Sequence, residues 1–162
     1  MDRLNSHDPR AIANKILDIR EAQGEPLTVM QLIKLVYMSD GWTMAALDRP
    51  LSSEPPQAWQ YGPVYPKVYR AFRRFGANPV TDKATLAGTD IAISETFSED
   101  EDRLINAVVK AYGKLSAYQL SNLTHQPNTP WSKAYASGAY SQISAAEMKR
   151  HFDELRAKPV AG

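Results

Sequence analysis

Cysteine is absent from this 162-residue sequence. Without thiols the chain can form no disulfide bond, and it offers neither a thiolate nucleophile nor a thiolate metal site. A charge excess is missing too, because 19 lysines and arginines face 18 aspartates and glutamates, for a formal net charge of +1. This balance gives no bulk electrostatic attraction to nucleic acid or to an anionic membrane. Binding to either would therefore need a local basic patch.

A secretory signal is not visible either, because the first ten residues, MDRLNSHDPR, are polar and contain no apolar run. We therefore expect a cytoplasmic protein. Hydrophobic residues make up 43% of the chain, and its length suits one domain with an adequate core. The patterns below predict a flexible N-terminus at 1–7, a single compact helical domain at 8–156 and a flexible tail at 157–162.

The most apolar stretch runs from Thr28 to Leu47 and predicts the central helix of the fold. Thr28 followed by Gln31 is a capping box, which marks a helix start. Apolar residues then recur on nearly every side, and a helix of this kind is buried rather than laid on a surface. Lys34 and Asp40 lie inside the stretch, so we do not expect it to cross a membrane.

Further capping signals predict helices before and after this stretch. They are Asp8–Pro9, Ser98 with Glu101, Ser116 with Gln119, Thr129–Pro130 and Ser144 with Glu147. Together with the apolar periodicity they predict a mainly α fold, with five to seven helices around a buried central helix at about 28–47. The segments 50–60 and 78–95 predict a small antiparallel β-sheet. The run from Tyr61 to Val64 predicts a tight turn into the next helix.

The three histidines, His7, His125 and His151, are not spaced as metal ligands from one another or from carboxylates, so a metal site is not predicted. The sequence contains no glycine-rich phosphate loop and no G-x-S-x-G nucleophile elbow, so we predict neither a cofactor nor an enzyme. A catalytic triad assembled from distant residues stays open as an alternative. It would be favoured by a deep pocket that holds His125 beside a carboxylate.

A short basic run falls on a predicted helix and consists of Lys67, Arg70, Arg73 and Arg74. Positions 67, 70 and 74 share one side of that helix. Such a face is most often simply solvated. Its functional interpretations are an acidic protein partner or the backbone of a nucleic acid.

Two proline-braced loops carry aromatic residues. The first reads Trp59-x-Tyr61-Gly62-Pro63-Val64-Tyr65, and the second runs from His125 through Thr129 and Pro130 to Trp131. Aromatic residues in such loops serve either as core residues or as interface anchors. The pattern does not sort them, although Trp59 is the one we most expect inside. We expect His125 to bond loop carbonyls while the Trp131 indole covers the core.

Three blocks of residues occur in a recognisable order. L-x-K-L-x-Y is met by Leu32 to Tyr37, and A-W-x-Y-G-P-V by Ala58 to Val64. The third block comprises Tyr112, Gly113, Ser116, Ala117, Leu120, Ser121, Thr124, His125, Pro130 and Trp131. Over about residues 10–153 the sequence resembles the Panacea domain, the SocA-like family of bacterial and prophage antitoxins. The proline pair Pro55–Pro56 departs from the family pattern, because many members have an ordinary strand there.

The resemblance implies a non-catalytic antitoxin that neutralises its cognate toxin by direct protein binding. It also implies a second mode, in which a SocA-like antitoxin acts as a proteolytic adaptor and delivers its toxin to the ClpXP protease. The basic run supplies an alternative function, a DNA-binding autorepressor that uses the helix around 67–74.

We predict a partner-binding surface made of Trp59, Tyr61, Tyr65, Tyr69, Arg70 and Arg73. Aromatic and arginine side chains are the usual anchors of protein interfaces. The other motif residues are predicted to act as structure, and they are Gly62, Pro63, Val64, His125, Pro130 and Trp131.

Overall fold

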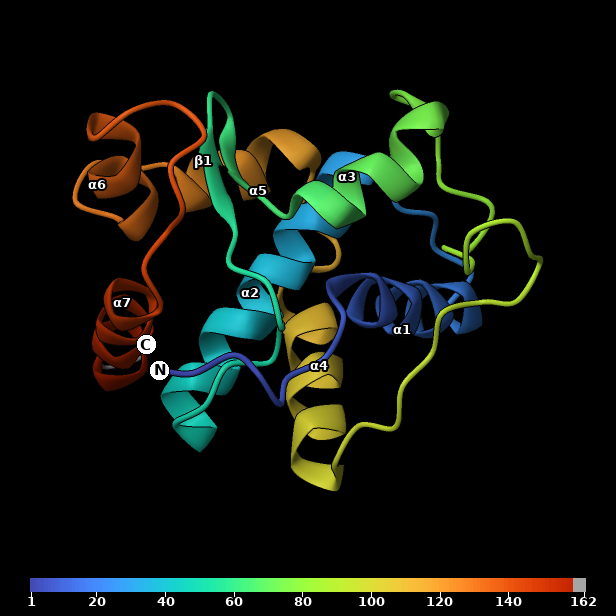
Figure 1. Cartoon of the computed structure of the whole chain (residues 1–162), viewed down its shortest axis with the longest axis horizontal. Coiled ribbons are helices and arrows are strands. Elements are labelled where there is room, and N and C mark those ends of the chain that lie inside the picture. The colour runs from blue at the N-terminus through green and yellow to red at the C-terminus, as the bar shows by residue number, and fades with distance from the viewer. Residues whose placement is uncertain (159–162) are drawn as a thin grey trace.

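One helix, α2 (Val29–Leu47), forms the centre of the molecule (Figure 1). The computed structural model describes residues 1–158 of the chain. Thr28 caps α2 as predicted, since its hydroxyl accepts from the Gln31 N–H and the Gln31 side chain accepts from the Thr28 N–H. Most residues around the whole circumference of α2 are buried, which confirms the predicted buried central helix.

Six further α-helices in the described chain accompany α2. They are α1 (Pro9–Ala22), α3 (Pro66–Phe72), α4 (Glu99–Tyr112), α5 (Ala117–Thr124), α6 (Pro130–Ala136) and α7 (Ala145–Ala157). A short 3-10 helix, η1 (Arg73–Phe75), extends α3. Helices α1, α3, α4, α5 and α7 all pack against α2. The prediction of a mainly α fold of five to seven helices is confirmed.

Each surrounding helix begins at a polar cap or a proline. Ser98, Ser116 and Thr129 each accept a hydrogen bond from the N–H three positions on, within a capping box. Asp8 caps α1 through the N–H of Arg10. Prolines stand at the start of α1, α3 and α6, where the missing N–H has no helical partner to lose.

The polar residues of α2 are buried together with the apolar ones. Lys34, Ser39 and Asp40 are each 0% exposed. All three have hydrogen-bond partners, as buried polar groups require. Ser39, for example, donates to the carbonyl of Leu35 at 2.8 Å. No helix in residues 1–158 combines the length and the apolar character needed to cross a membrane.

The sheet is one two-stranded hairpin in the part of the chain that the structure describes. Strands β1 (Gln57–Trp59) and β2 (Gly62–Val64) are antiparallel, with Ala58 opposite Pro63. Ala58 turns its N–H and C=O to the other side, where they bond Ser141 and Tyr140, both at 2.8 Å. Pro63 therefore occupies a strand position that needs no N–H, which explains how a proline is accommodated.

Two predictions about this region are wrong. The sequence predicts a tight turn at 61–64, whereas Gly62–Val64 pairs as β2 and the turn lies at 60–61. The sequence predicts strands in the 78–95 segment, but this segment makes only isolated bridges, such as Thr85 to Ala92. The side-chain amide of Asn14 bonds the backbone of Ala84 and Ile93, so part of the hydrogen bonding of this segment goes to α1.

The two ends of the chain bear on the predicted domain limits. Arg3 reaches Asp40 at 3.0 Å, and the His7 N–H donates to the Leu51 carbonyl at 2.8 Å, so the first residues contact the core. The flexibility of residues 1–7 stays a prediction. The predicted tail at 157–162 lies outside the described residues from 159 onward, while residues 157 and 158 are the end and the C-cap of α7.

Candidate interaction surface

The hairpin rests on a buried lysine from the central helix. Lys34 Nζ donates to the Pro63 carbonyl at 2.8 Å. Gly62 lies directly against this ammonium group, because a Cβ at position 62 would stand 3.1 Å from Lys34 Nζ and 3.1 Å from Thr124 Oγ1. Its φ of +121° is also a conformation open mainly to glycine. The close approach and the dihedral angle together require glycine at this position.

Burial changes the acid–base behaviour of Lys34. Desolvation lowers the pKa of its ammonium group from 10.5 to about 7. Within residues 1–158 the hydrogen-bond acceptor of Lys34 is a neutral carbonyl rather than a carboxylate. Lys34 therefore titrates near neutral pH inside the core, next to the hairpin.

Two further motif residues hold the hairpin backbone. The Ser121 hydroxyl in α5 donates to the Tyr61 carbonyl, and the indole N–H of Trp131 in α6 donates to the Trp59 carbonyl at 2.6 Å. The Trp131 ring meets His125 edge to face at 5.3 Å. His125 in turn directs Nδ1 at the Ser121 carbonyl. These contacts support the proposal that His125 and Trp131 act as structure.

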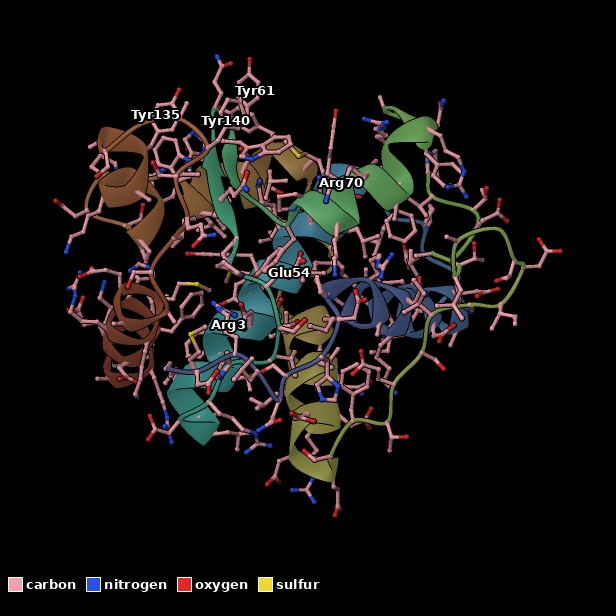
Figure 2. All side chains as sticks on the ribbon, in the orientation of Figure 1. Arg3, Glu54, Tyr61, Arg70, Tyr135 and Tyr140 are labelled. Atoms are coloured by element: carbon pink, nitrogen blue, oxygen red, sulfur yellow. The ribbon has the colours of Figure 1, made fainter. Side chains whose placement is uncertain are left out.

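Four aromatic side chains gather on the hairpin and the segments beside it, and we call Trp59, Tyr61, Tyr69 and Tyr140 the aromatic patch. The Trp59 ring meets Tyr69 at 5.0 Å and Tyr140 at 5.5 Å, both edge to face. Tyr61 is 61% exposed and Tyr140 is 64% exposed. Figure 2 shows these two tyrosines at the same edge of the molecule. Grouped, exposed aromatic residues are typical of protein-binding surfaces.

Sequence reasoning does not identify Tyr140 as part of this patch. Tyr140 lies between α6 and α7, and its N–H bonds the Ala58 carbonyl of β1 at 2.8 Å. Its φ is +67°, an uncommon conformation for a bulky residue and one that tends to occur where function or packing holds it. Gly138 signals a turn nearby, but nothing local indicates that the turn pairs with β1.

Tyr65 does not belong to the surface, and its prediction as a partner-binding residue is wrong. The side chain is 0% exposed, and its hydroxyl donates to Asp40 Oδ2 at 2.7 Å. Burial and the nearby carboxylate raise the pKa of Tyr65 well above its usual value. The sequence favoured Trp59 as the internal aromatic, whereas Tyr65 is the core residue and Trp59 stays partly exposed.

The carboxylate of Asp40 explains why Tyr65 turns inward. Oδ1 accepts from the N–H groups of Leu51 and Ser52, at 2.9 and 3.1 Å. Oδ2 accepts from Tyr65 and from Arg3, the latter at 3.0 Å. A buried charge is tolerated when it is paired and its lone pairs are filled. This network fixes the segment that leads into the hairpin and the N-cap residue of α3.

The predicted basic face divides into paired and unpaired residues. Lys67 pairs with Glu54 at 3.1 Å, and Arg74 lies 3.9 Å from Asp82. Arg70 and Arg73 are exposed, and neither side chain forms an ion pair with any part of the described chain. Half of the positive face available to a nucleic-acid backbone is therefore already neutralised.

His125, which the catalytic alternative requires, contacts Ser121 and Trp131 but no carboxylate among residues 1–158. His7 is the histidine that lies between carboxylates, with Glu95 at 2.8 Å and Glu101 at 2.9 Å. No cluster of three side chains able to hold a metal ion occurs in the described residues.

Comparison with known proteins finds relatives over most of the chain. A family described as "Antitoxin SocA-like, Panacea domain" matches residues 32–132. The curated protein Antitoxin SocA of Caulobacter vibrioides (strain NA1000 / CB15N) is 35% identical over 130 residues, which are 78% of this chain and 69% of that protein. No solved structure matches the chain. The matched segment contains Lys34, the hairpin, Ser121 and Trp131.

Proposed function

Because the chain belongs to the family of SocA-like antitoxins with a Panacea domain, we propose that it neutralises a cognate toxin protein by binding it directly. An antitoxin role follows from this family membership. The contact with the toxin is proposed to be made by the aromatic patch, with Arg70 and Arg73 beside it. Both proteins would act in the cytoplasm, and binding alone would silence the toxin without catalysis.

The observation that supports this proposal best is an exposed aromatic patch on a hairpin whose backbone is already fixed. Lys34, Ser121 and Trp131 bond the hairpin from three different helices. A rigid backbone loses little conformational entropy on binding, so more of the contact energy appears as affinity. Tryptophan, tyrosine and arginine are the side chains that dominate the energy of protein interfaces.

Two modes of neutralisation use the same contact. In the first the antitoxin covers the working surface of the toxin. In the second it acts as an adaptor, holds the toxin and delivers it to the ClpXP protease. The patch supports toxin binding in either mode.

Co-expression tests the function and separates the two modes. The product of the adjacent gene is produced alone and together with this protein, in cells with and without active ClpXP, and growth is measured. We expect the neighbour to be toxic alone and harmless in the presence of this protein. Relief that requires ClpXP identifies an adaptor, and relief without the protease identifies occlusion. A neighbour that is harmless alone, or that stays toxic beside this protein, contradicts the antitoxin function.

A further inference from the structure

Arg70 and Arg73 differ from every other arginine of the described chain. Each of the others has an acceptor within the protein. Seven form ion pairs, namely Arg3, Arg10, Arg20, Arg49, Arg74, Arg103 and Arg150. Arg156 donates to the Ala45 carbonyl at 2.9 Å. Two guanidinium groups thus point to the exterior with no acceptor among residues 1–158.

Both of these arginines lie close in sequence to Tyr69, one residue of the aromatic patch. Tyr69 and Arg73 are four residues apart on one helical turn that runs from α3 into η1, so they share a face. Arg70 directly follows Tyr69, whose ring packs on Trp59 at 5.0 Å. Figure 2 shows Arg70 on α3, beside the hairpin that carries Tyr61. A partner that covers Tyr69 and continues along α3 and η1 would also remove water from these guanidinium groups.

Resting on the proposed antitoxin function, we infer that the toxin segment bound by the aromatic patch is acidic, with apolar side chains against the rings and carboxylates paired to Arg70 and Arg73. A dehydrated guanidinium without an acceptor is costly, so a stable complex must supply one. A carboxylate is the best protein acceptor, because it accepts two parallel N–H bonds from arginine.

Nucleic acid offers the rival chemistry, since phosphates pair with arginine and bases stack on aromatic rings. The charges around the patch favour protein. The carboxylates of Glu54 and Asp82 pair with Lys67 and Arg74 and cancel these flanking positive charges. A track of phosphates needs several unopposed cations, and the net charge of +1 adds no general attraction.

Calorimetry with matched charge-removal variants tests this inference. The purified product of the adjacent toxin gene is titrated into the full chain at about 50 and about 300 mM salt. These concentrations lie below and above physiological ionic strength, so they screen charges less and more than the cell does. Arg70→Gln/Arg73→Gln removes two positive charges beside the patch. Arg103→Gln/Lys110→Gln removes two from α4, a helix that carries no residue of the aromatic patch. We expect the first variant to bind at least about tenfold more weakly at low salt, with a smaller loss at high salt, and the second to stay within about twofold.

The other outcomes overturn the inference in distinguishable ways. Equal losses in both variants indicate attraction by net charge alone. Full affinity in Arg70→Gln/Arg73→Gln, combined with weak binding by Tyr61→Ala/Tyr140→Ala, overturns the acidic segment and leaves the antitoxin function standing. Failure of the toxin to bind the unmodified chain overturns both. Displacement of the toxin by a random DNA duplex, through the same two arginines, assigns the patch to nucleic acid.

Discussion

The indole N–H of Trp131 donates to the backbone carbonyl of Trp59 at 2.6 Å, joining residues 72 positions apart. The bond ties α6 to the strand that carries the central ring of the aromatic patch. Because the Trp131 ring also stacks on Tyr135 at 4.9 Å, the donor is held in place before any partner arrives. The core in this way holds the backbone of the hairpin.

Removing this donor is expected to weaken the fold. Trp131→Phe keeps most of the ring and should lower the free energy of unfolding by roughly 1–2 kcal/mol, the value of one hydrogen bond. Trp131→Ala should lower it by about 2–4 kcal/mol, because the ring is partly buried. Urea unfolding measures both. A Trp131→Ala protein that keeps its melting temperature and loses only partner binding would show that the residue belongs to the interface.

Adding one methyl group at position 62 is expected to disturb the hairpin. Gly62→Ala meets both an unfavourable φ and the Lys34 ammonium at 3.1 Å, and should cost roughly 2–3 kcal/mol of stability. Gly24→Ala is the matched control, because φ there is +69° but no atom lies within 4 Å of the added Cβ. It should cost about 1 kcal/mol, from the backbone alone. Equal losses would mean that the contacts with Lys34 and Thr124 and the φ of +121° at position 62 add nothing to the cost.

The buried Lys34 predicts a rise of stability with pH. Its pKa is about 7 in the folded chain and 10.5 in the unfolded chain, so the unfolded state binds more protons between these values. The free energy of unfolding should therefore increase from pH 7 toward pH 9, and fall back as the pH drops through 7. Tyr37 and Tyr65 also have raised pKa values, but they change the free energy of unfolding only near and above pH 10, the usual pKa of tyrosine.

Lys34→Met should abolish this slope, which urea unfolding at pH 7, 8 and 9 would measure. Methionine preserves the length and removes the titrating group. The same slope in both proteins would show that another group titrates in this range.

Tyr65 and Tyr61 should respond oppositely to mutation, although they stand four positions apart. Tyr65→Phe removes the hydroxyl that donates to the buried Asp40 carboxylate, and should lower the unfolding free energy by roughly 2–3 kcal/mol. Tyr61→Phe changes an exposed side chain and should stay within about 0.5 kcal/mol. Thermal unfolding distinguishes the two. A stable Tyr65→Phe protein would argue against the Asp40 network as a stabilising element.

Helices were predictable from the sequence because their signals are local. A capping residue and its partner are three positions apart, so Ser98 and Ser116 identify α4 and α5 without knowledge of the fold. The glycine and proline of the hairpin were identified as motif residues. The sequence did not predict that they pair as β2. Pro63 is tolerated there because the N–H of Ala58, its partner residue, bonds Ser141 on the side away from β2.

The site was less predictable because its composition depends on distant contacts. Tyr61 and Tyr65 look alike in the sequence, and the hydrogen bond from the buried Tyr65 to Asp40, 25 residues away, is not visible there. Tyr140 reaches the patch through pairing of its segment with β1. The division of the basic run likewise depends on Glu54 and Asp82, which no local pattern connects to Lys67 and Arg74.

The affinity of Tyr61→Ala/Tyr140→Ala for the product of the adjacent gene tests the central claim most directly. Leu86→Ala/Ile91→Ala is the control, because it also truncates two exposed apolar residues, in the 84–92 loop on the far side of Figure 1 from β1. We predict that the tyrosine variant binds at least about tenfold more weakly at an unchanged melting temperature, and that the control binds normally. Normal binding by the tyrosine variant, or an equal loss in the control, would contradict toxin recognition by the aromatic patch.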